Sequence, residues 1–491
     1  MAKNYLALDL GAESGRAMVG ILDGDTLKLE ERHRWSSAHG RLNGHYHWDL
    51  IAQWEQIKTG LRKAAAGTPL AGLGVDTWGV DFGLLDRNGD LLGNPYMYRD
   101  SRTEGLVEKA CAVVSRQRIF ETTGIQFMHI NSLYQLLAMR LARSPILDAA
   151  DALLFMPDLF NYLFTGRKVN EFSIATTSQM YDPRRRNWAF DLLAALDLPS
   201  RILREIVPSG TVLGDLKPDV ADECGVSPIP VIAPGCHDTA SAVAAVPADA
   251  PAGAWCYISS GTWSLMGVEL AGPLIDDKAA RYNYTNEGGV GGSIRFLKNI
   301  MGMWLVQECR RHWEKQGESL NYAQLAAMAE SARPFVALVD PEHQPFFSPG
   351  DMPAKVVEFC RQTGQSPPST KGEFVRSILE SLALTYRKTI EGLEDILGHR
   401  IGVIHIVGGG CQNELLNQMT ADACARPVVA GPVEATAAGN VLTQAIALGE
   451  VRDLAAARAI VRGSFGVKRY EPRDTGAWEE TWARYRNMVG S

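Results

Sequence analysis

Short apolar runs that end at small or acidic residues recur along the chain and predict buried strands. The first run extends from Tyr5 to Leu10, breaks at the small-residue turn 11–15 and returns over Arg16–Leu22, which is the pattern of a hairpin. A strand, a small-residue turn and a returning strand are expected again over residues 255–268, about 250 residues downstream. Two such units far apart in the sequence predict two related halves.

The rest of the pattern mixes buried strands with amphipathic helices, and this mixture predicts an α/β protein. A chain of 491 residues is too long for one hydrophobic core, because single cores stop growing at roughly 250–300 residues. We expect two domains, 1–247 and 248–491, with their boundary in the Pro- and Ala-rich stretch Pro247–Gly253. Further strands are expected over 73–85 (a strand pair), 230–233 and 401–407, and helices over 374–393 and 415–425.

The composition, with 46% hydrophobic and 21% charged residues, is typical of a globular protein rather than a disordered one. The net charge of −7 gives no reason to expect a nucleic acid or an anionic membrane as partner. The first apolar run ends too early for a signal peptide, and no run of about 18 apolar residues predicts a membrane span. We therefore expect a cytoplasmic protein. The eight cysteines are scattered without a CxxC pair, which argues against zinc and against required disulfides.

Four histidines, His33, His39, His45 and His47, fall in one early segment. They could bind a metal, but no neighbouring Cys or Glu spacing supports a metal site. We expect solvated or hydrogen-bonded structural roles for them.

The first candidate site is the turn that follows Asp9. A buried strand delivers this carboxylate, which could hold Mg²⁺, usually through water. The small residues of the turn 11–15 leave backbone N–H groups able to face phosphate oxygens, and Arg16 could add a charged fork. The alternative is an ordinary glycine-containing hairpin turn, and the motif alone does not separate the two.

A second glycine-rich turn, Gly408–Gly410, follows an expected strand and precedes an expected helix. Three glycines let the backbone approach a nucleotide closely, and the N-terminus of a helix favours negative charge. The segment is not a P-loop, because no Gly-Lys-Ser/Thr follows, and its spacing is not that of a dinucleotide fingerprint. The alternative is a tight strand-to-helix turn.

Asp238 is the candidate general base. It follows His237 at the expected start of a helix, after the strand 230–233. A carboxylate in that place could accept the proton of an attacking hydroxyl. The alternative is that Asp238 simply caps the helix, because Asp is among the best N-cap residues.

One further set of residues suits a sugar, and another set contains two amides among apolar residues. Trp78 stands among small and charged residues in Gly74–Gly83, and Tyr98–Arg102 adds more charged groups. The alternatives are a core position for Trp78 and turn chemistry for the aspartates. Asn299 and Gln307 are a little over two helical turns of about 3.6 residues apart, so we expect their amides on similar faces of one helix. The alternative is two amides satisfied by nearby backbone.

Together these segments resemble the FGGY family of carbohydrate kinases, and they occur in the family's order from about residue 5 to residue 450. Single motifs are weak evidence, but this many in order is highly specific. The strings look like those of the family members that act on L-rhamnulose. They are GVDTWGVDF (74–82), YRDSRT (98–103), HDTASAV (237–243), SSGTWSLMG (259–267), TNEGG (285–289), LKNIMG (297–302) and HIVGGGCQN (405–413).

The resemblance implies two actin-like (ribonuclease H-like) ATPase domains with a catalytic cleft between them, the N-terminal domain binding sugar and the C-terminal domain binding ATP. It implies ATP- and Mg²⁺-dependent phosphorylation of a ketose 1-hydroxyl, with L-rhamnulose as the expected ketose in L-rhamnose catabolism. L-Fuculose or L-xylulose are alternative substrates. A non-catalytic sugar- and ATP-binding regulator and an actin-like structural or chaperone ATPase are alternatives of other classes. The expected partners are small molecules only, and we expect a monomer or a weak homodimer.

The family's residue roles carry over to matching positions of this sequence. Asp238 would be the catalytic base and Asp9 would hold the metal. Glu13 departs from the family pattern, since a small residue is more usual there, and its role is open. Residues 131–136 also differ from the broader family, which often has Lys and Trp in this motif. The implied ATP contacts are Ala12, Glu13, Ser14, Gly15, Arg16, Thr262, Gln307 and Gly409, and the implied sugar contacts are Gly79, His237, Asp238, Thr239 and Asn299.

Overall fold

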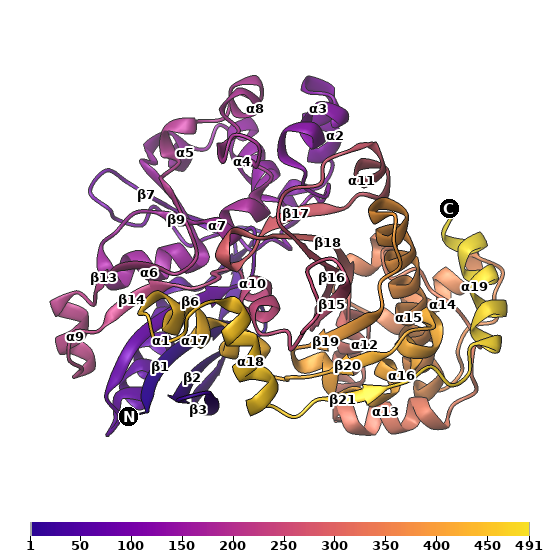
Figure 1. The fold of residues 1–491 in the computed structure, drawn as a ribbon. Coiled ribbons are helices and arrows are strands. Elements are labelled where there is room, and N and C mark those ends of the chain that lie inside the picture. Colours follow the sequence, from indigo (N-terminus) through magenta and orange to yellow (C-terminus); the bar gives the residue numbers. More distant parts are fainter. Residues whose placement is uncertain (1, 491) are drawn as a thin grey trace. The chain divides into compact units, whose positions relative to one another are not determined.

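The computed structural model describes residues 2–490 and has a mixed α/β architecture (Figure 1). The chain forms two compact units, each assembled from three segments of the sequence. The first unit contains the residues up to Asp249 together with Glu269–Phe296 and Glu434–Phe465. The second unit contains Ala250–Val268, Leu297–Val433 and the residues from Gly466 onward. The domain boundary expected at 247/248 stays a prediction.

A six-stranded sheet in the order β13-β14-β6-β1-β2-β3 forms the centre of the first unit. The predicted hairpin is confirmed, because β1 and β2 pair antiparallel, and β3 extends the antiparallel ladder. Strands β6 and β14 add in parallel beside β1, and β13 closes the edge antiparallel. The strands are β1 Lys3–Leu10, β2 Ser14–Asp23, β3 Thr26–Ser36, β6 Leu70–Thr77, β13 Thr211–Asp215 and β14 Pro230–Ala233.

Helices α1 (Leu50–Ala65) and α17 (Ala435–Ala447) cover this sheet. Both approach the strands closely through glycines, and α17 also packs against α10 (Asp238–Ala244). A Cβ atom on Gly439 would lie 1.8 Å from the backbone oxygen of Ser241, so only glycine allows α17 to come this near α10. This contact helps to fix the start of α10 beside the sheet.

The second unit repeats the plan of the first sheet. Its strands follow one another in the order β18-β16-β15-β19-β20-β21, with β18 represented by its residues from Leu297 onward. β15 and β16 form an antiparallel hairpin, β19 and β20 add in parallel, and β21 pairs antiparallel at the edge. The same succession of pairings in both sheets confirms the two related halves predicted from the sequence. The strands are β15 Trp255–Ser260, β16 Trp263–Leu270, β18 Ile294–Met301, β19 Val403–Val407, β20 Val428–Ala430 and β21 Lys468–Tyr470.

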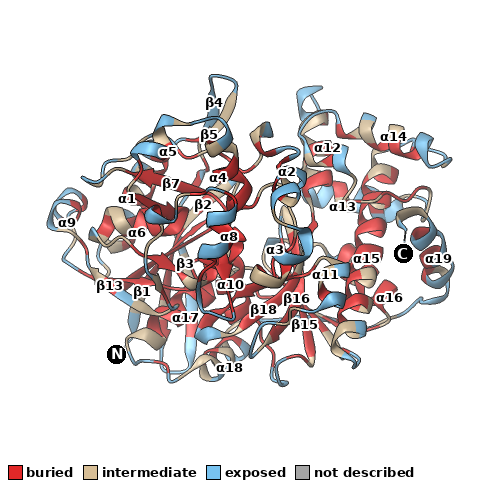
Figure 2. Ribbon diagram, turned by 90° about the horizontal axis from the view of Figure 1, so that it is seen from above, coloured by how far each residue is buried: buried red, intermediate tan, exposed pale blue. Residues whose placement is uncertain are grey.

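Helices surround the strands of the second unit, and buried residues concentrate on the strands and on α15 and α16 (Figure 2). The predicted helices over 374–393 and 415–425 are confirmed as parts of α15 and α16. Within residues 2–490, no helix has the length and apolar character needed to cross a membrane. The helices are α12 Trp304–Lys315, α13 Tyr322–Ser331, α14 Met352–Gln362, α15 Lys371–Leu397, α16 Glu414–Cys424 and α19 Gly476–Val489.

The strand pair expected over 73–85 is wrong in one respect. Two strands form there, β6 and β7 (Phe82–Leu85), but they do not pair with each other. β7 pairs instead with β8 (Ala152–Phe155) in a separate two-stranded sheet. The loop between β6 and β7 turns away because Val80 adopts a left-handed backbone conformation, with φ 67°.

Candidate active site

Three carboxylates of the first unit lie at the ends of its parallel strands. Asp9 is near the end of β1, and Asp76 is its direct partner in the register of β6. Asp238 follows β14 as the first residue of α10. His237 precedes it and forms a parallel bridge with Thr77 of β6. Because carboxyl ends of neighbouring parallel strands share one sheet edge, the fold brings these residues together.

Asp238 combines a partly exposed carboxylate with two polar neighbours. Its side chain is 31% exposed, and its Oδ1 accepts a hydrogen bond from Thr239 Oγ1 at 3.1 Å and lies 3.4 Å from His237 Nε2. Burial raises the pKa of Asp238 above its ordinary value; the nearby Asp9 also raises this pKa, while a positive charge on His237 would lower it. The N-cap of α10 is His237 and not Asp238, so the capping alternative for this carboxylate is wrong by one residue.

Asp9 is engaged by Arg16 across the β1–β2 hairpin, and the same guanidinium contacts Glu434 at the start of α17. Asp9 is the main cause of the raised pKa of Arg16. The guanidinium of Arg16, which we expected to contact phosphate, is therefore already paired with two carboxylates. Glu434 stands 418 residues from Arg16 in the chain, and no local pattern predicts their contact.

Asp76 is fully buried. Its Oδ2 accepts a hydrogen bond of 2.6 Å from Asn440 Nδ2 on α17, and its Oδ1 has no hydrogen-bond partner among the described residues. Burial first, and then the charge of Asp9, raise the pKa of Asp76 well above its ordinary value. Asn440 carried no sequence signal, because it stands in an otherwise ordinary helical pattern.

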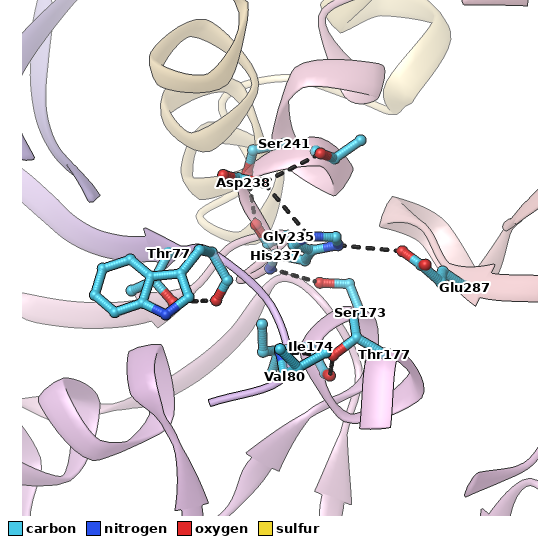
Figure 3. A network of polar contacts seen from close by, with 12 residues as sticks. Thr77, Val80, Ser173, Ile174, Thr177, Gly235, His237, Asp238, Ser241 and Glu287 are labelled. Carbon is cyan, nitrogen blue, oxygen red and sulfur yellow. Dashed lines mark hydrogen bonds and ion pairs between the residues drawn. The ribbon is translucent and has the colours of Figure 1, made fainter. Parts of the chain in front are cut away.

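His237 is held from three sides (Figure 3). Its backbone N–H donates to Ser173 Oγ at 3.0 Å, and Ser173 in turn donates to the buried carboxylate of Glu171 at 2.6 Å. Its Nδ1 lies 3.0 Å from Arg295 Nη2 and 3.4 Å from Glu287 Oε2. These neighbours fix the imidazole plane beside Asp238. The one sign of this contact in the sequence is an arginine within an otherwise apolar strand pattern.

The loop after β6 borders His237. A Cβ atom on Gly79 would lie 3.3 Å from His237 Nε2 and 3.4 Å from the side chain of Thr177. The absence of a side chain at Gly79 therefore keeps space open beside the imidazole. Trp78 is only 5% exposed and packs on Trp48 at a ring distance of 4.1 Å, so the core alternative for Trp78 is the one that the structure supports.

Asp81 stabilises this loop through buried hydrogen bonds. Its Oδ2 accepts the indole N–H groups of Trp48 at 2.7 Å and Trp78 at 3.0 Å, and its Oδ1 accepts from Gln135 at 2.9 Å. Burial raises the pKa of Asp81 to about 6 despite these hydrogen bonds. The carboxylate thus ties β7, the loop and a neighbouring helix residue into one rigid support.

The first phosphate-type turn is a tight hairpin. Gly11 N–H donates to Ser14 O at 3.0 Å, and Glu13 O accepts from Ser37 N–H at 3.0 Å. Glu13 itself is exposed to solvent. A Cβ atom on Gly15 would lie 2.3 Å from the ring of Trp35, so this glycine is required by packing whatever the turn binds. Ala12 and Ser14 are half-buried in the same turn.

In the second unit, the glycine triplet lies against the β15–β16 turn. A Cβ atom on Gly410 would lie 2.1 Å from Ser260 Oγ, whereas one on Gly409 would meet nothing within 4 Å. Thr262 O accepts the N–H of Trp304 at 3.2 Å, and this contact starts α12. Gln307, one turn into α12, has a buried Oε1 without a hydrogen-bond partner among the described residues. Thr262, Gln307 and the triplet therefore gather around one turn.

The expectation that Asn299 and Gln307 share one helix is wrong. Asn299 lies in strand β18, and Gln307 lies in α12, which begins only at Trp304. The chain leaves the strand at Gly302, where a Cβ atom would lie 2.7 Å from Ser264 Oγ. Close packing of this glycine on β16 lets the backbone bend there.

Each of the four early histidines has a hydrogen-bond partner: His33 with Gln56, His39 with Ser37 O, His45 with Asp100 and His47 with Asn94 O. Over residues 2–490, no group of three or more His, Cys, Asp or Glu side chains is arranged to hold a metal ion.

Comparisons with known proteins agree over nearly the whole chain. Residues 4–245 match the model of the N-terminal domain of the FGGY family of carbohydrate kinases, and residues 256–448 match that of its C-terminal domain. A rhamnulokinase of Bacteroides thetaiotaomicron is 44% identical over 491 residues, covering 100% of both chains. A rhamnulokinase of Oceanobacillus iheyensis is 40% identical over 471 residues, covering 96% of this chain and 98% of that one.

Among solved structures, gluconate kinase from Lactobacillus acidophilus aligns with a TM-score of 0.81 at 15% identity, covering 100% of this chain and 98% of that one. At this identity the likeness concerns the fold alone. Together with the repeated sheet plan, it confirms the predicted actin-like fold.

Proposed function

The chain belongs to the FGGY family of carbohydrate kinases, and on this premise we propose that it transfers the γ-phosphoryl group of ATP to the 1-hydroxyl of L-rhamnulose. The products are L-rhamnulose 1-phosphate and ADP, in the catabolism of L-rhamnose. The observation that carries the proposal is the partly exposed carboxylate of Asp238 beside His237. Full-length relatives that bear the name rhamnulokinase support the choice of sugar.

Asp238 is the general base of this proposal. As the 1-hydroxyl oxygen bonds to the γ-phosphorus, the hydroxyl proton moves to a carboxylate oxygen of Asp238. The bond between phosphorus and the bridging oxygen breaks, and its electron pair leaves on ADP. The raised pKa of Asp238 makes it a stronger base, because a general base works best when its pKa lies near the working pH. The hydrogen bond from Thr239 orients the carboxylate.

We assign the sugar contacts to Gly79, His237, Asp238, Thr239 and Asn299. The room beside His237 that Gly79 leaves supports this assignment, since a bulky sugar needs to approach the imidazole. Thr239 acts through its hydrogen bond to Asp238. Asn299 belongs to the second unit, and its place in the sugar set rests on the family resemblance.

We assign the ATP contacts to the two turns and to Gln307. The buried Oε1 of Gln307 supports this role, because a donor group of a nucleotide would satisfy it. Gly409 is exposed, with open space at its Cβ position, so a nucleotide can approach its backbone. Glu13 points to solvent, which avoids a buried carboxylate next to phosphate. The remaining assigned contacts are Ala12, Ser14, Gly15, Arg16 and Thr262.

Mg²⁺ is the metal that such a reaction implies, and the residues of the first unit fit it. Carboxylate oxygens are ligands that Mg²⁺ prefers, and Asp9 stands opposite Asp76, whose Oδ1 has no partner among the described residues. Mg²⁺ usually keeps waters and takes substrate phosphates as ligands, so it needs no cage built only from side chains. Asp9 would hold the ion. Bound with ATP, Mg²⁺ would neutralise charge on the phosphates.

The remaining assignments belong to the same proposal. They place sugar binding in residues 1–247, ATP binding in 248–491 and the reaction in the cytoplasm, where the eight cysteines would stay reduced. A catalytic cleft between the domains and a monomeric or weakly dimeric state stay predictions.

The test is ADP release measured with ATP and Mg²⁺ across L-rhamnulose, L-fuculose and L-xylulose. The expected result is the highest kcat/KM for L-rhamnulose. A higher kcat/KM for another ketose would make that ketose the substrate and leave the family unchanged. Binding of ketose and ATP without any ADP release would favour a regulator, and ADP release that needs no ketose would favour an actin-like structural or chaperone ATPase.

A further inference from the structure

Arg295 is an unusual residue for its position. It lies on β18 within the first unit and is 0% exposed. Its Nε donates to Gly288 O at 2.8 Å, and its Nη2 reaches both His237 Nδ1 at 3.0 Å and Glu287 Oε2 at 3.2 Å. A buried arginine costs desolvation and is retained where its charge and donors are used. Here its closest side-chain partner is the imidazole beside Asp238.

The chemistry of the two partners decides which nitrogen of His237 carries the proton. A guanidinium has only N–H donors and keeps its proton at all ordinary pH values. Nδ1 of His237 must therefore be the acceptor of the 3.0 Å contact. An imidazole whose Nδ1 accepts is neutral and carries its hydrogen on Nε2. The same Nη2 also lies 3.2 Å from Glu287 Oε2, as an ion pair.

Glu287 opposes Arg295, because it would favour a proton on Nδ1 of His237. Its Oε2 lies 3.4 Å from the same Nδ1 and would favour a proton there, which would make the imidazole a cation or reverse its tautomer. The Arg295 contact is the shorter one, and Arg295 also contacts Glu287 directly. The charged groups that face His237 are thus Arg295 and Glu287 at Nδ1 and Asp238 at Nε2, and the N–H of Arg295 occupies Nδ1 in place of the proton that Glu287 would favour.

We propose that Arg295 is a positioning residue that holds His237 neutral, with its hydrogen on Nε2. That hydrogen faces the space bordered by Asp238 Oδ1, at 3.4 Å, and by Gly79, whose Cβ position lies 3.3 Å from Nε2. The space beside Gly79 is then bordered by one hydrogen-bond donor, His237 Nε2–H, and one acceptor, Asp238 Oδ1. The ion pair with Glu287 balances the charge of Arg295, and the hydrogen bond to Gly288 O fixes the orientation of its guanidinium.

The consequence for catalysis rests on the proposed function. His237 Nε2–H donates to a sugar oxygen near the reacting hydroxyl, while Asp238 takes the hydroxyl proton. A neutral His237 also leaves the basicity of Asp238 intact, whereas an imidazolium at 3.4 Å would stabilise the ionised carboxylate and weaken it as a base. The site should therefore discriminate between sugars, because a fixed hydrogen-bond donor and a fixed acceptor reject a substrate whose groups do not match them.

The direct test is nitrogen NMR of the ligand-free, full-length protein labelled with ¹⁵N in its histidines. His237→Gln identifies the His237 signals by their loss. The expected spectrum has an unprotonated Nδ1 and a protonated Nε2 for His237 from pH 6 to 8. A proton on Nδ1, or on both nitrogens, in the wild-type protein overturns the proposal. This readout needs no activity, so it stands or fails apart from the kinase assignment.

The second arm uses Arg295→Met and Arg295→Lys, each checked for folding by circular dichroism and thermal unfolding, with Glu287→Gln as the matched change in the same cluster. If folded, Arg295→Met should show protonation of His237 Nδ1 and lower kcat/KM for the ketose by up to about 10²-fold, the cost of a small misplacement. Its KM for ATP should stay unchanged. Glu287→Gln should keep the Nε2–H form, and Arg295→Lys should restore it in part. A folded Arg295→Met protein with the wild-type His237 spectrum would overturn the proposal.

Discussion

Asp76 and Asp9 are directly opposed on the parallel strands β6 and β1, and among residues 2–490 only Asp9 of the two forms an ion pair, with Arg16. Two carboxylates so close cannot both ionise without cost, and the fully buried one, Asp76, has the raised pKa. Burial and the charge of Asp9 therefore both oppose ionisation of Asp76 at the end of the central strands.

Asp76→Asn should become more stable than the wild type as the pH rises. The folded-state pKa of Asp76 lies above its unfolded value, so the folded protein binds more protons, and wild-type stability falls as pH rises from about 4 toward the folded pKa. Asn cannot ionise and removes this penalty. Urea unfolding of both proteins at pH 5 and pH 8 measures the difference. A stability difference that is equal at the two pH values would mean that Asp76 is ionised in both states.

Asp238→Asn should lower turnover by about 10²–10⁴-fold, the usual contribution of a positioned general base. Binding of ketose and ATP should persist, because Asn keeps the shape of the side chain. Steady-state kinetics and isothermal titration calorimetry separate the two effects. Asp25→Asn, a change at an exposed residue of the same type, is the control. Near-normal turnover would remove Asp238 from the mechanism.

Gly79→Ala should raise KM for the ketose while leaving KM for ATP unchanged. The new methyl group would lie 3.3 Å from His237 Nε2 and 3.4 Å from Thr177, which narrows the space assigned to the sugar. Gly40→Ala is the matched control, because its Cβ would meet nothing within 4 Å. Equal ketose KM values for Gly79→Ala and Gly40→Ala would place the sugar elsewhere.

The glycine triplet offers a pair of neighbouring substitutions with opposite expectations. Gly410→Ala should destabilise the protein by about 1–3 kcal/mol, the usual cost of overpacking, because its Cβ would lie 2.1 Å from Ser260 Oγ. Gly409→Ala should fold normally, since its Cβ position is open, and should weaken ATP binding. Chemical denaturation and nucleotide titration test both. Normal ATP affinity in Gly409→Ala would argue against a nucleotide contact at this turn.

Much of the fold was readable from local pattern. The strand–turn–strand unit at Tyr5–Leu22 and its copy at 255–268 are hairpins because apolar runs interrupted by small residues have few other ways to bury themselves. The carboxylate of Asp238 after β14 could be identified for the same reason, since strand end and helix start are both local signals. The repeated sheet plan follows from this repeated pattern.

Other features depended on residues far apart in the chain. The sequence around 73–85 predicts two strands but not their partners, and β7 pairs with β8 because the loop at Val80 turns it away from the main sheet. Asn299 and Gln307 have helical spacing, yet close packing of Gly302 on β16 divides them between a strand and a helix. Spacing describes one element at a time, and the packing of a glycine decides where an element ends.

The sequence by itself determined which strands, turns and carboxylates this protein has, because strand and turn signals act over a few residues. Only the tertiary structure decided the partners of those carboxylates: Glu434 beside Arg16, Asn440 beside Asp76, and Arg295 beside His237. The physical reason is that a charge buried in low dielectric takes whichever partner the fold brings near. That partner comes from a segment remote in sequence, where no local pattern announces it.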